Sequence, residues 1–205
     1  PDIAKNKFLT GFSVTPGNPE AVHHVILYGL YTSADKKLAD KLEAKDDRYG
    51  FRCFGTSGID YAPMLAAWAP GTPPIVYPDE TGVRLTPDME LVMQVHYHLD
   101  GGEAEPDQSA VNLTLANSVE NEAVLFPAGN WEFELEPGQA SVSDEQKFLD
   151  FIGPVGDVRV HAVAPHMHTA GKQMQVEVGL GRERQCLLDV QDWDFDWQGL
   201  YFYEE

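Results

Sequence analysis

Long runs of apolar and β-branched residues dominate the first half of the chain and predict strands. The strongest runs are Ala21 to Leu30 (AVHHVILYGL), Met89 to Leu99 (MELVMQVHYHL) and Ala110 to Ala116, with a shorter extended pattern at Phe8 to Val14. Runs of this length that are rich in Val, Ile, Leu and Tyr and bounded by turn residues are typical of strands, and Ala21 to Leu30 is expected to be a buried one. We therefore expect a sheet in this half of the chain.

The segments between these runs have a different pattern. The charged stretch from Ser33 to Arg48 contains a predicted short helix at Asp35 to Ala44, and Asp60 to Trp68 (DYAPMLAAW) predicts a helical turn. Pro70 to Pro78 holds four prolines, and Asp100 to Asp107 (DGGEAEPD) is rich in turn residues. Both are predicted to be loops, because proline fixes φ and removes a backbone donor.

The second half repeats short apolar runs separated by Gly and Pro turns. Such spacing favours a β-sandwich or a jelly roll. We place a domain boundary near Ser118, which gives an all-β chain of two β-sandwich domains, residues 1–118 and 119–205. The predicted short strands are Ala123 to Phe126, Asn130 to Leu135, Val155 to Ala164, Gln173 to Val178 and Gln185 to Val190.

Charge excludes several classes of partner. The chain has 33 acidic and 14 basic residues, and its net charge of −19 repels nucleic acid and anionic membrane surfaces. No stretch approaches the ~20 apolar residues of a membrane span. A start at Pro1, without a methionine or an apolar leader, predicts a processed form of a longer protein. The two cysteines, Cys53 and Cys186, could pair with each other, pair with other segments or stay reduced.

The seven histidines fall into three short clusters. These are His23 with His24, His96 with His98, and His161 with His166 and His168. Alternate residues of a strand point to one face, so His166 and His168 are expected to stand together and to bind a transition metal. Imidazole ligands suit copper, zinc, iron or nickel, and the affinity order favours copper. No HExxH, GxSxG or phosphate-binding loop is present.

Two histidines raise a question of strand geometry. His23 and His24 are adjacent, and neighbours on a regular strand point to opposite faces, so both can bind one ion only if the strand is distorted or the rings use different nitrogens. His161 lies five residues before His166 and would face the other side of an unbroken strand. We interpret His161 as structural. The acidic and aromatic segment Trp193 to Gln198 (WDFDWQ) is interpreted as a structural edge or interface segment.

The motifs HHVILYG, MQVHYH and HMHTAGK, in this order, resemble the copper type II, ascorbate-dependent monooxygenase family. The resemblance runs from about Phe8 to Val178 and implies two jelly-roll domains that each bind one copper ion. By this resemblance His23, His24 and His96 bind the electron-transfer copper, and Gln94 and Tyr97 flank that site. His166 and His168 then bind the oxygen-activating copper and act as the catalytic residues.

Several positions depart from the family pattern. The family's methionine ligand of the second copper has no counterpart before Glu205, and neither Met167 nor Met174 matches it. The second domain is thus expected to be truncated, and completed by a missing C-terminal segment or a second chain. Ala164 replaces an arginine that grips the peptide carboxylate in the peptide-hydroxylating branch. A peptide ending in glycine is therefore not the expected substrate.

Two further departures concern His98 and the cysteines. His98 stands where the family usually has glycine; we expect it to be a supporting or surface residue, with a fourth ligand or a replacement for His96 as alternatives. Leu30 stands where the family has a disulfide cysteine. Cys53 falls in the family's cysteine-bearing loop, and its partner would lie upstream of Pro1.

The expected function is a copper-dependent monooxygenase that hydroxylates a C–H bond of a small organic substrate, with two copper ions, O2 and a one-electron reductant such as ascorbate. The alternative is a non-catalytic copper-binding or electron-transfer protein on the same fold. A zinc-binding jelly roll is a more distant alternative. The resemblance implies a secreted protein, or one in the periplasm or a vesicle lumen.

Overall fold

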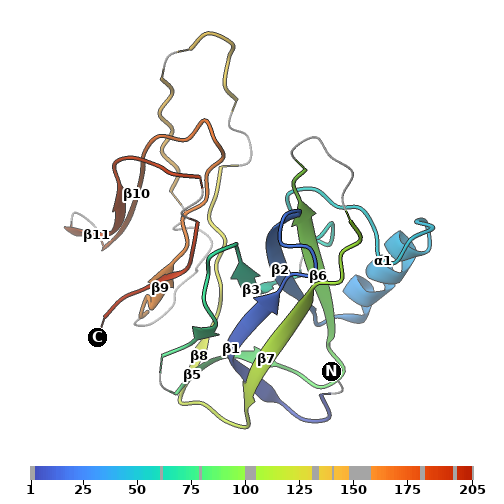
Figure 1. Cartoon of the computed structure of the whole chain (residues 1–205). Coiled ribbons are helices and arrows are strands. Elements are labelled where there is room, and N and C mark those ends of the chain that lie inside the picture. Colours follow the sequence, from blue (N-terminus) through green and yellow to red (C-terminus); the bar gives the residue numbers. More distant parts are fainter. Residues whose placement is uncertain are drawn as a thin grey trace. The chain divides into compact units, whose positions relative to one another are not determined.

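The structure is a computed structural model of the chain (Figure 1). It describes residues 3–60, 62–78, 80–99, 105–130, 134–139, 141–147, 158–180, 183–195 and 198–204. Two compact units are present: residues 1–125 with 161–205, and residues 126–160. The described residues contain strands and a single helix, which confirms the all-β class.

A five-stranded sheet is built around the first strand, β1 (Lys7–Thr15). One edge of β1 pairs with β7 (Ala110–Ala116) over nearly the whole length of both strands. The other edge pairs in turn with two short strands, β4 (Ile75–Val76) and β5 (Thr81–Leu85), and β8 (Asn121–Ala123) extends the sheet parallel to β5. The segment 70–78, predicted to be a loop, thus contains the two-residue strand β4 between its prolines. The strand β5 was not predicted.

The second sheet has three strands in the order β3, β2, β6. The central strand is β2 (Val22–Leu30), and β6 (Glu90–Tyr97) lies antiparallel beside it. The strands predicted at the two strongest apolar runs are thus confirmed. The prediction of a helical turn at Asp60 to Trp68 is wrong, because Met64–Trp68 forms strand β3. Leu, Ala and Met favour helices, but backbone pairing of β3 with β2 and burial of Leu65 override that local preference.

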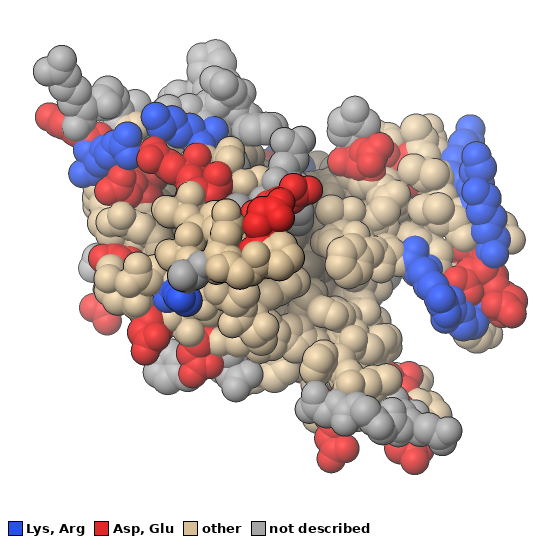
Figure 2. All heavy atoms as spheres, turned by 90° about the horizontal axis from the view of Figure 1, so that it is seen from above, with Lys and Arg blue, Asp and Glu red and all other residues tan. Residues whose placement is uncertain are grey.

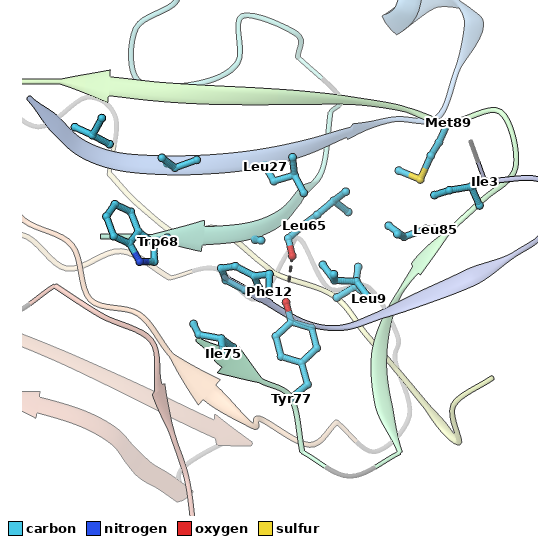
Figure 3. Close-up of a cluster of buried hydrophobic side chains, with 14 residues drawn as sticks. Ile3, Leu9, Phe12, Leu27, Leu65, Trp68, Ile75, Tyr77, Leu85 and Met89 are labelled. Atoms are coloured by element: carbon cyan, nitrogen blue, oxygen red, sulfur yellow. Dashed lines mark hydrogen bonds between the residues drawn. The ribbon is translucent and has the colours of Figure 1, made fainter. Parts of the chain in front are cut away.

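Side chains from both sheets form one hydrophobic cluster (Figure 3). Leu9 of β1 and Leu85 of β5 are fully buried, and Leu65 of β3 joins them from the other sheet. Tyr77 closes one side: its hydroxyl donates to the Leu65 carbonyl at 3.2 Å, and its ring packs edge-on against Phe12 with centroids 6.4 Å apart. Two sheets that share one core are the arrangement of a β-sandwich.

The helix α1 (Ser33–Glu43) agrees with the prediction to within two residues at its start. It begins with a capping box, in which the Thr32 side chain accepts from the Asp35 backbone N–H at 3.1 Å and the Asp35 carboxylate accepts from the Thr32 N–H at 3.3 Å. These bonds satisfy backbone donors that every helix leaves free at its N-terminus. The helix follows β2 directly and contacts it.

Residues 161–205 form two small antiparallel pairs. β10 (Met174–Leu180) pairs with β11 (Glu183–Val190), and β9 (Ala162–Val163) pairs with β12 (Tyr201–Phe202). The strands predicted at Gln173 to Val178 and Gln185 to Val190 are confirmed. The strand predicted at Val155 to Ala164 is reduced to β9, with its first residues outside the described part of the chain.

The unit formed by residues 126–160 has no regular element among its described residues. Half of the strand predicted at Asn130 to Leu135, residues 131–133, lies outside the described residues, and the other half forms no strand. The strand predicted at Ala123 to Phe126 is limited to the end of β8. Asn130 Nδ2 donates to the Asp144 carboxylate at 2.7 Å within this unit.

The acidic side chains are spread over the surface in separate groups, several of them beside Lys or Arg (Figure 2). Arg48 contacts Asp46 at 2.7 Å, and Arg184 contacts Glu177 at 2.9 Å. Exposed pairs of this kind each contribute little to stability. In the described part of the chain, no helix is long and apolar enough to cross a membrane.

Candidate metal centre

A β-bulge determines where the His23 side chain points. β2 and β6 pair in register from His24 opposite His96 to Leu30 opposite Glu90, but the register shifts between Val22 and His24. A bulge adds one residue to a strand and redirects its side chains. His23 and His24 therefore both reach His96, with ring centroids 5.0 and 4.6 Å from it. The strand distortion that two adjacent ligands require is present.

Three imidazole nitrogens converge at this bulge. His24 Nδ1 lies 3.1 Å from His23 Nδ1 and 3.3 Å from His96 Nδ1, and one nitrogen of each ring lies within 4.8 Å of the others. Two nitrogens that each bind one ion at about 2.0–2.1 Å, with an angle of about 90–120° between them, are about 2.9–3.6 Å apart. The spacing of these three rings fits a shared transition-metal ion such as copper.

The electrostatics of the group favour neutral imidazoles. Burial, followed by repulsion from His96 and His23, lowers the pKa of His24 to about 3. Burial and neighbouring histidines also lower the pKa of His23 and of His96 from 6.5. A metal binds the neutral ring, so at neutral pH these ligands need not first lose a proton.

His98 lies beside this group, just past the end of β6. Its backbone N–H donates to the Ala21 carbonyl at 2.8 Å, and its ring centroid is 6.1 Å from that of His23. The group of three convergent nitrogens does not include it. His98 instead lines a pocket together with His23, His96, His168, Thr169 and Phe195. Its role as a supporting residue stays a prediction.

His166 and His168 form a second pair. Their ring centroids are 5.2 Å apart with nearly perpendicular planes, so the two rings stand together as predicted. The expectation that a strand holds them is wrong, because β9 ends at Val163 and residues 164–168 have no regular structure. Pro165 lacks a backbone N–H and cannot continue a ladder. The His166 centroid lies 6.1 Å from that of His24, so both histidine groups belong to one region of this unit.

Two residues of the WDFDWQ segment contact the histidines, which the sequence interpretation missed. Gln198 Oε1 is hydrogen-bonded to His166 Nδ1, and the Phe195 ring stacks on His23 with centroids 4.9 Å apart and planes 18° apart. The sequence shows only that Phe195 and Gln198 lie in an aromatic segment without apolar alternation. This pattern does not indicate that they contact a histidine, or which one. Asp196 and Trp197 lie outside the described residues.

Gln94 and Tyr97 support the strand that carries His96. The Gln94 side chain is 8 % exposed; its Nε2 donates to the Thr56 carbonyl at 2.8 Å and to the Cys53 sulfur at 3.2 Å. Cys53 and Cys186 are both free thiols. The amide of Gln94 thus ties β6 to the Cys53 loop from the face of the sheet that carries His96.

Asp107 holds the C-terminal end of β6 through Tyr97. It was not among the residues predicted from the sequence. It accepts from the Tyr97 hydroxyl at 2.8 Å and from the Asn18 backbone N–H at 2.8 Å. Burial and this hydrogen bond raise the pKa of Tyr97 to about 12. The turn before β2 and the end of β6 are therefore held by the same carboxylate.

The fold and the site define a β-sheet protein with three histidines on paired strands that could hold a metal ion. Residues 1–103, which include all three of these histidines, match the model of the copper type II ascorbate-dependent monooxygenase N-terminal domain. This match spans half of the 205-residue chain. The chain belongs to the copper type II ascorbate-dependent monooxygenase family, as the resemblance implied.

Proposed function

We propose that the protein hydroxylates a C–H bond of a small organic substrate with O2 and a one-electron reductant such as ascorbate. The observation that carries this proposal is the convergence of His23, His24 and His96, whose neighbouring Nδ1 atoms are 3.1 and 3.3 Å apart. Membership of a copper-dependent family supports copper as the ion. The redox chemistry also requires a metal that cycles between one-electron states.

The two histidine groups would have different tasks. His23, His24 and His96 would hold the electron-transfer copper, because three neutral imidazoles occupy much of its coordination sphere. His166 and His168 would hold the catalytic copper, because two ligands leave positions open for O2. Bound copper would supply electron transfer at the first group and oxygen activation at the second.

The overall reaction balances without a further cofactor. A substrate C–H bond, O2, two electrons and two protons give a C–O–H group and one water molecule. Ascorbate supplies both electrons in two one-electron steps. A hollow lined by His23, His96, His98, His168, Thr169 and Phe195 adjoins both histidine groups, and we propose that the substrate approaches there. As the resemblance implies, we place the protein in an oxidising compartment: outside the cell, in the periplasm or in a vesicle lumen.

Copper stoichiometry tests the proposal. The full chain, loaded with Cu(II) and freed of excess metal, should retain two copper ions, and ascorbate should abolish their electron paramagnetic resonance signal. His166→Ala should retain one copper with the spectrum of the three-histidine group unchanged. A chain that takes up stoichiometric zinc and excludes copper would rule the proposal out, as would loss of both coppers in His166→Ala.

Product analysis separates a hydroxylase from a copper protein that only transfers electrons. With ascorbate and ¹⁸O2, a hydroxylase incorporates one ¹⁸O atom into a substrate, and His168→Ala should abolish this incorporation while copper in the first group is still reduced. Reduction and reoxidation of both coppers, without oxygen transfer to any member of a panel of small C–H compounds, would favour the electron-transfer alternative.

A further inference from the structure

The described residues 191–195 and 198–203 include segments that lie antiparallel to parts of residues 161–173, which carry the second histidine pair. At one end, Tyr201 pairs with Val163 and Phe202 with Ala162. At the other end, the Trp193 backbone N–H donates to the Lys172 carbonyl at 2.8 Å. His166 and His168 lie between these anchors. The described residues of 191–203 are therefore attached to both ends of the histidine loop.

Side-chain packing strengthens this attachment. A Cβ atom built on Gly171 would lie 3.0 Å from Trp193 Cδ1 and 2.8 Å from Met167 Cβ, so the indole packs directly on the turn that follows the histidines. Phe195 contacts both histidine groups: it stacks on His23 and approaches His168 edge-on with centroids 6.5 Å apart. Phe195 thus contacts one histidine of each group.

The hydrogen bonds of Gln198 fix the direction of its amide. Gln198 Nε2 donates to the Phe195 carbonyl at 2.7 Å. A carbonyl accepts only, so the NH2 group must face Phe195 and Oε1 must face His166. Oε1 in turn accepts only, and its partner His166 Nδ1 must therefore carry the proton. In the neutral ring this leaves the lone pair on Nε2.

From these contacts we infer that Gln198 is a positioning residue of the second histidine pair. It holds His166 as the Nδ1–H tautomer, so that Nε2 is the nitrogen offered to a metal ion. The inference rests on the proposed function only for the identity of the metal, which is copper. The tautomer itself is a property of the metal-free protein. A hydrogen bond to the far nitrogen of a metal-binding histidine fixes ring orientation and raises ligand basicity.

The first test needs no copper. Long-range ¹H–¹⁵N correlation spectra of the metal-free full chain at pH 8 report which ring nitrogen of His166 is protonated. The inference predicts Nδ1–H in the native protein and in Gln198→Glu, which keeps an acceptor oxygen. In Gln198→Leu, which removes the acceptor, the spectrum should change to a tautomer mixture. An Nε2–H ring in the native protein overturns the inference.

The second test uses copper. Gln198→Leu should weaken binding of the second copper by about 10–100-fold, and should alter the remote-nitrogen couplings of one imidazole in electron spin echo spectra. The matched control is Gln191→Leu, an exposed glutamine at the start of the same segment, which should leave both quantities unchanged. Equal effects of the two leucine variants, or no effect of Gln198→Leu, overturn the inference.

The outcomes also separate this inference from the proposed function. If His166→Ala leaves the copper content unchanged, the proposed role of His166 as a copper ligand is wrong, whatever its tautomer is. If His166→Ala removes one copper but Gln198→Leu changes neither tautomer nor affinity, the proposed function survives and the role of Gln198 is wrong. The Gln198→Glu variant keeps the shape of the side chain and serves as the folding control for the leucine variant.

Discussion

His24 and His96 lie directly opposite each other in the antiparallel pair of β2 and β6, with their Nδ1 atoms 3.3 Å apart. The backbone ladder therefore places two of the three converging histidines side by side before any metal binds. Such preorganisation lowers the free-energy cost of ordering the ligands when a metal binds. The third ring, His23, depends on the bulge next to this pair.

His96→Ala should weaken copper binding at the three-histidine group more than His98→Ala does. Loss of His96 removes one of three convergent nitrogens, whereas His98 stands outside that group. We expect a loss of more than about 100-fold for His96→Ala, above the range typical of supporting residues, and of less than about 10-fold for His98→Ala. Competition with a chelator measures both affinities. A collapse of affinity in His98→Ala would identify His98 as a ligand.

Gln94→Ala should lower the free energy of unfolding by about 1–3 kcal/mol. The substitution leaves the Thr56 carbonyl without the donor that lies 2.8 Å away and opens space in a buried site. Urea unfolding of the metal-free protein measures the change. Gln108→Ala, at an exposed position before β7, is the matched control and should stay within about 0.5 kcal/mol of the native protein. Equal stabilities of the two variants would contradict the role given to Gln94.

The elements that the sequence predicts correctly are those with long runs of β-forming residues. β2 and β6 are long runs of β-formers, and the strands predicted for both are confirmed, although β2 is largely buried and β6 is not. β3 was predicted as helical because Leu, Ala and Met have helical preferences, and only pairing with β2 determines its strand conformation. β5 was missed because Gly82 and Arg84 interrupt its short apolar pattern.

In the candidate site, too, residues that form a sequence pattern were predicted, and residues positioned by tertiary contacts were not. The histidine clusters were identifiable because seven histidines in three groups form an unusual pattern. Gln198 and Asp107 were not, since each meets its partner through tertiary contacts: Gln198 lies 32 positions from His166, and Asp107 lies 10 positions from Tyr97. Adjacent histidines on a strand indicated a distortion, but the bulge itself follows from pairing with β6.

The metal-free protein should lose stability as pH falls below about 6.5. The pKa of His24 is lowered from 6.5 to about 3 in the folded chain, first by burial and then by its neighbours. Between these values the unfolded chain binds more protons, so the free energy of unfolding falls with falling pH, by up to about 1.4 kcal/mol per pH unit for one such histidine. Above pH 6.5 this contribution is fully present.

Urea unfolding at several pH values between 8 and 4.5 checks this dependence. His24→Asn removes the titrating ring, so the difference in stability between native protein and variant should shrink as pH falls. Carboxylates contribute equally to both proteins and cancel in this difference. A difference that does not change with pH would contradict the lowered pKa of His24.

Thr32→Ala should lower the free energy of unfolding by about 1 kcal/mol. The substitution removes the acceptor for the Asp35 N–H at 3.1 Å and loosens the reciprocal bond from the Asp35 carboxylate. Helical circular dichroism and urea unfolding follow the effect. Ser33→Ala, at the exposed first residue of α1, is the control and should change stability by less than about 0.5 kcal/mol. A similar loss in both variants would show that the capping box adds nothing.

The bulge between Val22 and His24 makes the metal group dependent on residue count as well as on residue type. Deletion of Val22 would place His23 opposite Tyr97 in an uninterrupted ladder and turn its ring to the side of the sheet opposite His24. All three histidines would still be present in the sequence. Related chains that keep these histidines but pair His23 in a regular ladder should therefore be deficient in metal binding, a defect that side-chain comparison alone does not reveal.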